Sequence, residues 1–186
     1  MKNLFSKMAF LALVFVSIVV VSCKKEDNHD HGSDQEQITT ATITFSLPGG
    51  VTATASWRDI DGAGGNSPVI DTLVLNPITT PLNYTATISF LDESKTPALN
   101  VTEEVQEKSD EHLLVLQPSA NLNWLIVTND KDKNGKDLGL NQTVTVAGSG
   151  NGTLRVVLKH EPDKNASNPL NTGETDLDII IPVRVN

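Results

Sequence analysis

The sequence predicts an all-β protein, an antiparallel immunoglobulin-like β-sandwich of about nine strands, on three observations. Apolar residues alternate with Thr and Ser over short stretches, most regularly from Leu82 to Phe90. Clusters of turn-forming residues, such as Pro48-Gly49-Gly50, separate these stretches. Thr, Val, Ile, Asn and Gly dominate the composition. Period-two alternation is typical of strands with one buried face, and regular turns between such strands favour two sheets packed face to face.

The expected strands run in order from residue 38 to the end of the chain. They cover residues 43–47, 51–57, 69–75, 82–90, 111–117, 122–124, 143–147, 153–161 and 176–185. Residues 102–110 lack the alternation, and Glu104 and Lys108 stand at the i,i+4 spacing that stabilises a helix. We therefore expect one short helix near 102–110, capped by Thr102.

The second half of the chain resembles the first. Leu114–Pro118 matches Ile43–Pro48, and Asp130 stands 71 positions after Asp59 at the start of a similar acidic loop. These matches indicate a degenerate internal duplication. The alternative is convergence between two Thr-rich β segments.

Residues 1–22 predict a lipoprotein signal peptide. Lys2 and Lys7 flank the start of an apolar run from Met8 to Val21, which is too short for an ordinary membrane span. Val20-Val21-Ser22-Cys23 resembles a bacterial lipobox, in which the signal is cut before the cysteine and the thiol carries a diacylglycerol. We expect lipidation of Cys23, with two or more acyl chains giving a stable membrane anchor. The alternative is a free or buried thiol near an ordinary cleavage site.

Residues 23–37 are polar and acidic without periodicity, which predicts a flexible tether to a β-sandwich domain over residues 38–186. Lys24-Lys25-Glu26-Asp27 looks like the export signal of Bacteroidota lipoproteins that reach the outside of the outer membrane. The expected location is therefore the outer membrane, lipid-anchored and exposed at the cell surface.

Charge and composition exclude several classes of function. The formal charge is −9, and it becomes −11 once the two lysines of the signal segment are removed. Such an acidic chain is a poor nucleic-acid binder, but its charge is compatible with cation binding. There is no Gly-x-Ser-x-Gly nucleophile motif, and lipidation of Cys23 would leave no free thiol. The sequence therefore predicts a protein that is not an enzyme.

A metal site is the strongest candidate for chemistry. His112 and His160 are the only histidines after residue 38, and both stand at predicted strand ends beside carboxylates. If the last two strands pair, acidic residues of the final strand approach His160. Imidazole with carboxylate suits a borderline metal such as zinc. The candidate ligands are His112, His160, Glu161, Glu174 and Asp176. The alternative is a pair of structural histidines.

A second candidate is a calcium-like loop. Asp130-x-Asp132-x-Asn134-Gly135 matches the first half of an EF-hand loop, with Asp137 as a further oxygen ligand. Position 141, where the completing glutamate belongs, is Asn141, so a complete EF-hand is excluded. The alternative is ordinary turn chemistry.

Several motifs together resemble a family of small, uncharacterised Bacteroidota lipoproteins. They are the lipobox, Trp57–Gly62, Glu103–His112, Leu158–Pro162 and Gly173–Asp176. Members are often labelled type 1 periplasmic binding fold superfamily proteins, and some are encoded near TonB-dependent receptors. The label implies a two-lobed α/β protein, whereas the residues here predict strands within one domain's length. The resemblance implies a TonB-dependent receptor or another outer-membrane protein as partner.

Together these features predict a non-enzymatic outer-membrane or surface lipoprotein that binds a ligand. The expected ligand is a divalent metal ion, zinc or calcium, or a metal chelate, and the protein would serve as accessory to an outer-membrane receptor. The alternative is a structural or adhesive β-module that binds another protein, for which a large exposed apolar patch would be the mark.

Overall fold

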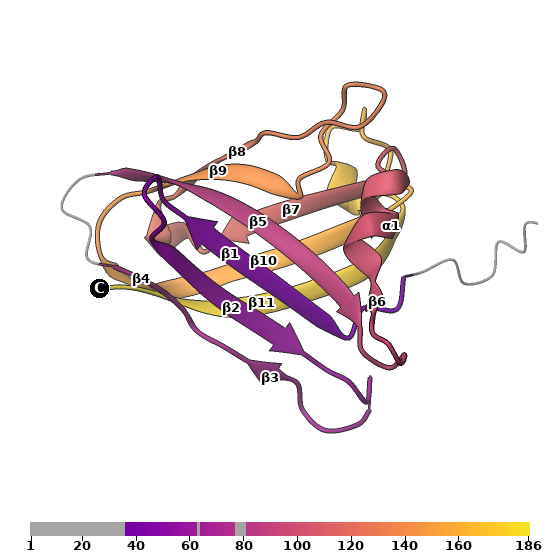
Figure 1. The fold of residues 1–186 in the computed structure, drawn as a ribbon. Helices are drawn as coiled ribbons and strands as arrows, with labels where there is room; N and C mark the ends of the chain where they lie inside the picture. The colour runs from indigo at the N-terminus through magenta and orange to yellow at the C-terminus, as the bar shows by residue number, and fades with distance from the viewer. Residues whose placement is uncertain (1–35, 63, 77–80) are drawn as a thin grey trace, which may run out of the picture. The chain divides into compact units, whose positions relative to one another are not determined.

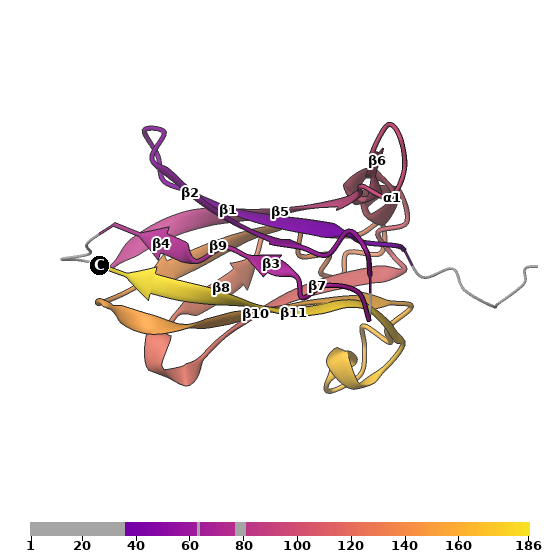
Figure 2. The same ribbon diagram turned by 90° about the horizontal axis from the view of Figure 1, so that it is seen from below.

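The computed structural model describes residues 36–62, 64–76 and 81–186, which form two β-sheets packed face to face (Figures 1 and 2). The signal segment, Cys23 and residues 23–35 of the expected tether lie outside the described residues. Within the described part, no helix has the length and apolar character needed to cross a membrane.

The first sheet holds seven strands. Their order is β3 (Val69–Ile70), β2 (Thr52–Arg58), β1 (Thr40–Ser46), β5 (Leu82–Asp92), β9 (Asn141–Val146) and β8 (Leu125–Thr128), and β6 (Leu99–Asn100) pairs with the end of β5. The second sheet has the order β4 (Leu73–Leu75), β11 (Glu174–Val185), β10 (Gly150–His160) and β7 (His112–Pro118). The all-β sandwich expected from the sequence is confirmed, and the α/β architecture implied by the family label is not found.

The alternating residues of both sheets form one core. On β1 and β5, Phe45 and Phe90 are fully buried, and Leu158 on β10 is buried from the opposite sheet. Burial of each such side chain stabilises the fold by about 1.5–3 kcal/mol. The period-two pattern thus locates the core side of each main strand.

The strands differ from the expected ones in several details, among them two additional strands, β6 and β8. The stretch 69–75 is divided between the sheets, because the chain crosses from β3 in the first sheet to β4 in the second. β4 pairs with β11 in parallel, at Leu73 opposite Val183, so the sandwich is not wholly antiparallel. Residues 122–124 are not a strand: a 3₁₀ helix, η1 (Ala120–Leu122), precedes β8. A second such turn, η2 (Pro169–Asn171), lies between β10 and β11.

The sequence similarity between the two halves is only partly reflected in the topology. β1 pairs with β5, and its counterpart β7 pairs with β10, in both cases antiparallel. However, β1 and β2 are neighbours in one sheet, whereas β7 and β8 belong to different sheets. The two halves therefore do not fold as equivalent units.

The expected helix forms as α1 (Val101–Glu107), and it carries the chain to the start of β7. Its N-cap is Asn100 and not Thr102. The Thr102 hydroxyl instead accepts a hydrogen bond from Phe90 N–H and donates one to Phe90 C=O, which holds α1 on β5. The expected Glu104–Lys108 ion pair is present at 3.0 Å.

Candidate metal centre

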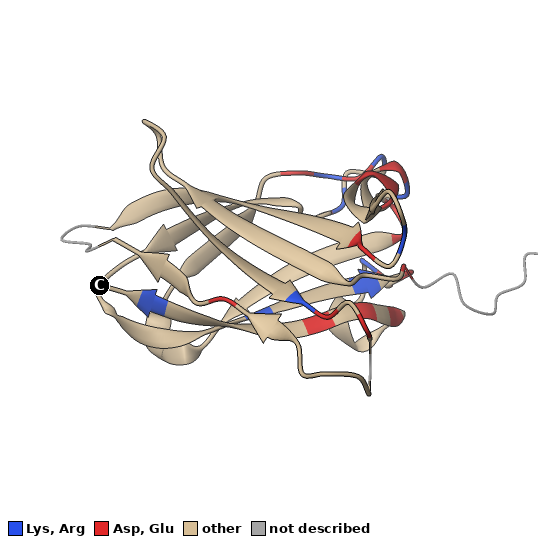
Figure 3. Ribbon diagram, turned by 60° about the horizontal axis from the view of Figure 1, so that its bottom comes forward, with Lys and Arg blue, Asp and Glu red and all other residues tan. Residues whose placement is uncertain are grey.

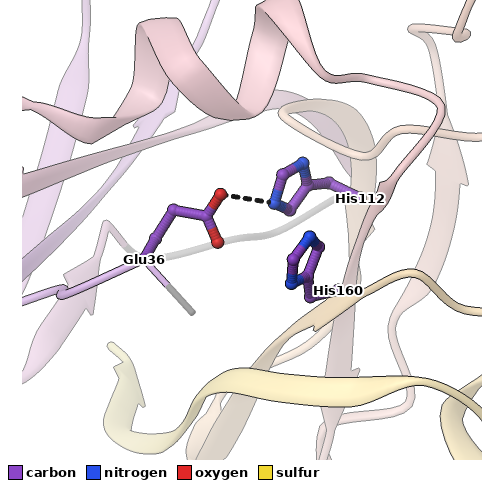
Figure 4. A group of neighbouring side chains, drawn as sticks. All are labelled: Glu36, His112 and His160. Carbon is purple, nitrogen blue, oxygen red and sulfur yellow. Dashed lines mark ion pairs between the residues drawn. The ribbon is translucent and has the colours of Figure 1, made fainter. Parts of the chain in front are cut away.

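Four titratable side chains meet at the end of the sandwich where β7 begins and β10 ends. We call Glu36, His112, His160 and Asp176 the His–acid cluster. Figure 4 shows Glu36 reaching toward the two histidines from its own segment, with α1 nearby. Ligand atoms of Glu36, His112 and His160 all lie within 4.8 Å of one another, and these residues are buried. Charged residues of both signs gather toward this end (Figure 3).

Strand register brings the two histidines together. His112 is the first residue of β7 and lies directly opposite His160, the last residue of β10. Their rings stack with centroids 5.0 Å apart and an angle of 9° between the planes. His112 Nδ1–H donates to the Lys108 carbonyl at 3.0 Å, so Nε2 is the nitrogen that faces the cluster. A backbone carbonyl on the far ring nitrogen is a common arrangement for a metal-binding histidine.

A β-bulge places Asp176 inside the protein. Between β10 and β11 the register passes from Leu158 opposite Leu177 to Lys159 opposite Thr175, so Asp176 is the extra residue. Beyond the bulge, the even-numbered residues Asp178 and Ile180 face outward and are exposed. Asp176, in contrast, has a side chain that is 0% exposed, with Oδ2 3.8 Å from His112 Nε2. Bulges commonly redirect a side chain beside a functional site.

Glu36 closes the cluster from the first sheet. It lies four residues before β1, and its side chain is 2% exposed. Its Oε1 lies 3.0 Å from His112 Nε2, an ion-pair distance. No oxygen of the Glu36 or Asp176 carboxylates forms a well-directed hydrogen bond within the described residues, and neither does His112 Nε2. Buried polar atoms without partners are uncommon and call for a bound proton, water or ion.

Burial and charge displace the proton affinities of the cluster. Burial raises the pKa of the Asp176 carboxyl to about 7, and the nearby Glu36 charge adds to this increase. Burial also acts to raise the pKa of Glu36, but interaction with His112 outweighs it and holds this pKa at about 2. Burial acts to lower the pKa of His112, but the interaction with Glu36 outweighs burial, so this pKa is raised overall. At neutral pH the cluster therefore places an ionised Glu36 carboxylate beside an Asp176 carboxyl that readily takes up a proton.

Two residues expected as ligands lie outside this cluster. Glu174 is directly opposite His160 in the register, but it is exposed; its charge contributes only to the raised pKa of Asp176. Glu161 is also exposed, with a positive φ of 48° at the turn that follows β10. A different acid, Glu111, lies 4.0 Å from His160 Nε2 at the rim.

Glu36 is the functional candidate that the sequence analysis missed. It falls within residues 23–37, which the sequence predicts as a tether, and no periodicity distinguishes it from the other acids there. The structure instead places it against β7, at the start of the compact unit that spans residues 34–186. Its position shortly before the first strand was the only available signal.

The calcium-like loop has its oxygens engaged by the protein itself. Asp132 accepts hydrogen bonds from Asn134 N–H and Lys136 N–H, and its other oxygen pairs with Lys164 Nζ at 2.9 Å. The Asp130 carboxylate accepts from two backbone N–H groups. Asp137 forms an ion pair with Lys131. A buried lysine at a site expected for calcium does not fit a cation, so the loop matches the alternative interpretation, turn chemistry.

We expect calcium to leave the thermal unfolding temperature unchanged. Addition of about 10 mM calcium would largely saturate extracellular calcium modules, whose dissociation constants are about 0.1–1 mM. Here the oxygens of Asp130 and Asp132 are already paired, so no binding free energy is available to stabilise the fold. A thermal shift measurement with and without a chelator tests this, and a rise of several degrees with calcium alone would contradict it.

No family model, no curated protein and no solved structure matches this chain. The fold and the His–acid cluster are therefore the observations on which a functional proposal rests.

Proposed function

We propose that this chain is a surface-anchored lipoprotein that binds a divalent metal ion, zinc in preference to others, in the His–acid cluster. The observation that carries the proposal is Asp176, whose carboxylate is fully buried without a hydrogen bond and turned toward His112 by a bulge. An uncompensated buried carboxylate is strongly unfavourable, so a cation or a proton must neutralise it.

The donor set favours zinc. Two imidazoles and two carboxylates are ligands that zinc commonly takes, whereas calcium prefers oxygen alone. Zinc–ligand bonds of about 2.0–2.1 Å in a tetrahedron place ligand atoms roughly 3.3 Å apart. The distances from His112 Nε2 to Glu36 and Asp176 oxygens are 3.0 and 3.8 Å, which bracket that value. The ligand atoms of Glu36, His112 and His160 lie within 4.8 Å of one another, so His160 would have to turn out of its stack with His112 to join the tetrahedron.

A proton on Asp176 is the competing occupant. Its raised pKa makes the protonated form available near neutral pH, and the adjacent Glu36 carboxylate can share that proton. Zinc binding would displace it, together with the proton of His112. The two occupants are distinguished by direct metal titration.

The sequence supports the location and the partner of this protein. The lipobox at Cys23 and the basic–acidic segment after it support a lipid anchor at the outer surface. The resemblance to lipoproteins encoded near TonB-dependent receptors supports a role as accessory to an outer-membrane receptor. In this role the protein holds the metal or its chelate and does not transform it.

The adhesive-module alternative receives less support. Its mark would be one large exposed apolar patch. Among the described residues, the most exposed apolar side chains are Val69 on β3 and Leu125 on β8, the strands at opposite edges of the first sheet. Apolar residues scattered in this way are ordinary for a surface.

Isothermal titration calorimetry with zinc tests the proposal. The protein is residues 23–186 with Cys23→Ser, titrated near pH 7.5 in the absence of chelator. We expect saturable binding at one site, weakened at least about 100-fold in Asp176→Asn and in His160→Ala, because each substitution removes a direct ligand. Asp178→Asn is the matched control, since it changes an exposed aspartate on the same strand. No binding heat, or equal affinity in Asp176→Asn, would overturn the proposal.

A further inference from the structure

We infer that Glu36 couples metal binding to docking of the segment that precedes the sandwich. When Glu36 binds the metal together with His112, His160 and Asp176, it holds this segment against the second sheet; we call this coupling the clasp. This inference rests on the proposed metal site and concerns its regulation. We call residues 36–39 the N-terminal arm. Its first residue supplies a ligand, and its last residue, Thr39, is fixed to the first sheet.

Thr39 provides a firm attachment at one end of the arm. Its N–H donates to Leu91 C=O at 2.9 Å, and its hydroxyl accepts from Glu93 N–H at 2.7 Å. Asp59 N–H donates to Thr39 C=O at 2.8 Å. No backbone hydrogen bond to another described residue holds positions 36, 37 or 38. Ile38 is partly buried and packs against the hydrophobic core. The arm is therefore fixed at Thr39, held by an apolar contact at Ile38, and held at its other end by Glu36.

Glu36 is the one member of the cluster that does not belong to the second sheet. His112, His160 and Asp176 come from β7, β10 and β11, which are neighbours in that sheet and hold their side chains in a fixed arrangement. Glu36 approaches from the lead-in to β1 of the first sheet (Figure 4). A metal bound by all four would join the arm to the second sheet.

Without metal, the docked arm is held by the Glu36–His112 ion pair and by packing of Ile38 against the core. Glu36 Oε1 lies 3.0 Å from His112 Nε2, and a second buried carboxylate, Asp176, has its Oδ2 3.8 Å from the same nitrogen, so two acids share one nitrogen partner. A divalent ion would replace this shared contact with two attractive contacts, one to each carboxylate. Metal binding thus strengthens the attachment of the docked arm and lowers the fraction of molecules in which the arm is lifted.

The burial of the cluster gives the arm a second role as a gate. The side chains of His112 and Asp176 are both 0% exposed while Glu36 is docked. Ligand exchange with solvent needs a path to these atoms. The backbone of residues 36–38 has no hydrogen bond to another described residue, so lifting of the arm is a path that breaks no backbone hydrogen bond at these positions. Cys23, the expected anchor, precedes Glu36 by thirteen residues in the sequence.

Cleavage of the Glu36–Gln37 bond by a glutamate-specific serine protease reports on the arm. The protein is residues 23–186 with Cys23→Ser near pH 8, with a chelator or with saturating zinc, and fragments are identified by mass spectrometry. Cleavage tracks the lifted fraction when docking is fast. We expect zinc to slow cleavage after Glu36 at least about tenfold. Cleavage after Glu26, which lies outside the arm, serves as the internal reference and should be unchanged.

A second measurement separates the clasp from the metal site. Glu36→Gln should weaken zinc binding about tenfold or more, because a neutral amide is a poor ligand. If zinc binds Glu36→Gln as tightly as it binds the unsubstituted chain, and if zinc does not slow cleavage after Glu36 in the unsubstituted chain, the clasp is wrong while metal binding stands. If the unsubstituted chain binds no zinc, the proposed function fails and the clasp fails with it.

Discussion

Replacement of His112 by alanine is expected to lower the free energy of unfolding by about 3–5 kcal/mol at neutral pH without metal. This substitution removes the only cation within ion-pair distance of Glu36 in the described part of the chain, and Glu36 and Asp176 remain buried. Loss of one partner from a buried ion pair typically costs that amount. Ordinary domains have only about 5–15 kcal/mol of stability in total. Urea denaturation in the presence of chelator measures the loss.

His160→Ala is the matched comparison for this prediction. It removes the same type of side chain from the directly opposite strand position. The carboxylate nearest to His160 Nε2 is Glu111, at 4.0 Å and with a half-exposed side chain, so this pair contributes little. We therefore expect a smaller loss of stability than in His112→Ala. Equal losses would show that the ion pair with Glu36 does not stabilise the fold.

The metal-free protein is expected to lose stability as pH rises from about 4 to 8. The pKa of Asp176 is raised from 3.8 to about 7, so between these values the folded state binds more protons than the unfolded state and stability falls with rising pH. His112, whose pKa is raised above 6.5, contributes stability that is likewise lost as pH rises through its folded pKa. Glu36 acts oppositely, but its contribution is complete above about 4.5. A tenfold change in proton affinity is worth about 1.4 kcal/mol, so the expected decrease is about 3 kcal/mol or more.

Asp176→Asn is the test variant for this pH dependence. The amide mimics the protonated carboxyl, so the variant should lose much of the decrease between pH 4 and 7 while retaining the part due to His112. Urea denaturation at several pH values, with chelator present, measures the slope. In the unsubstituted protein, saturating zinc should reverse the trend, because metal competes with protons at the cluster. An unchanged slope in Asp176→Asn would contradict the assignment of this titration to Asp176.

Much of the fold was predictable from local patterns. Alternation located β1, β2, β5 and the long strands β10 and β11, because each main strand buries one face. The i,i+4 pair Glu104–Lys108 located α1 for a similarly local reason. The assignment of strands to sheets was not predictable, since residues 69–75 read as one strand but divide between two sheets.

The candidate site was predictable only in part. The sequence pointed to His112, His160 and Asp176 because they are polar groups at or near the ends of predicted strands. It did not distinguish Asp176 from the neighbouring Glu174, since an uninterrupted pleat would turn both to the same face. The bulge at Leu158/Lys159 provides the distinction by directing Asp176 inward.

By itself, the sequence determined the period of the strands, the acidic balance and the presence of two histidines at strand ends, because these depend on residues close together in the chain. Only the tertiary structure decided which of these residues meet. Cross-strand register stacks His112 on His160, and packing of the first sheet on the second brings Glu36 to them. Such contacts join positions up to 140 residues apart, from Glu36 to Asp176, and no local pattern encodes them.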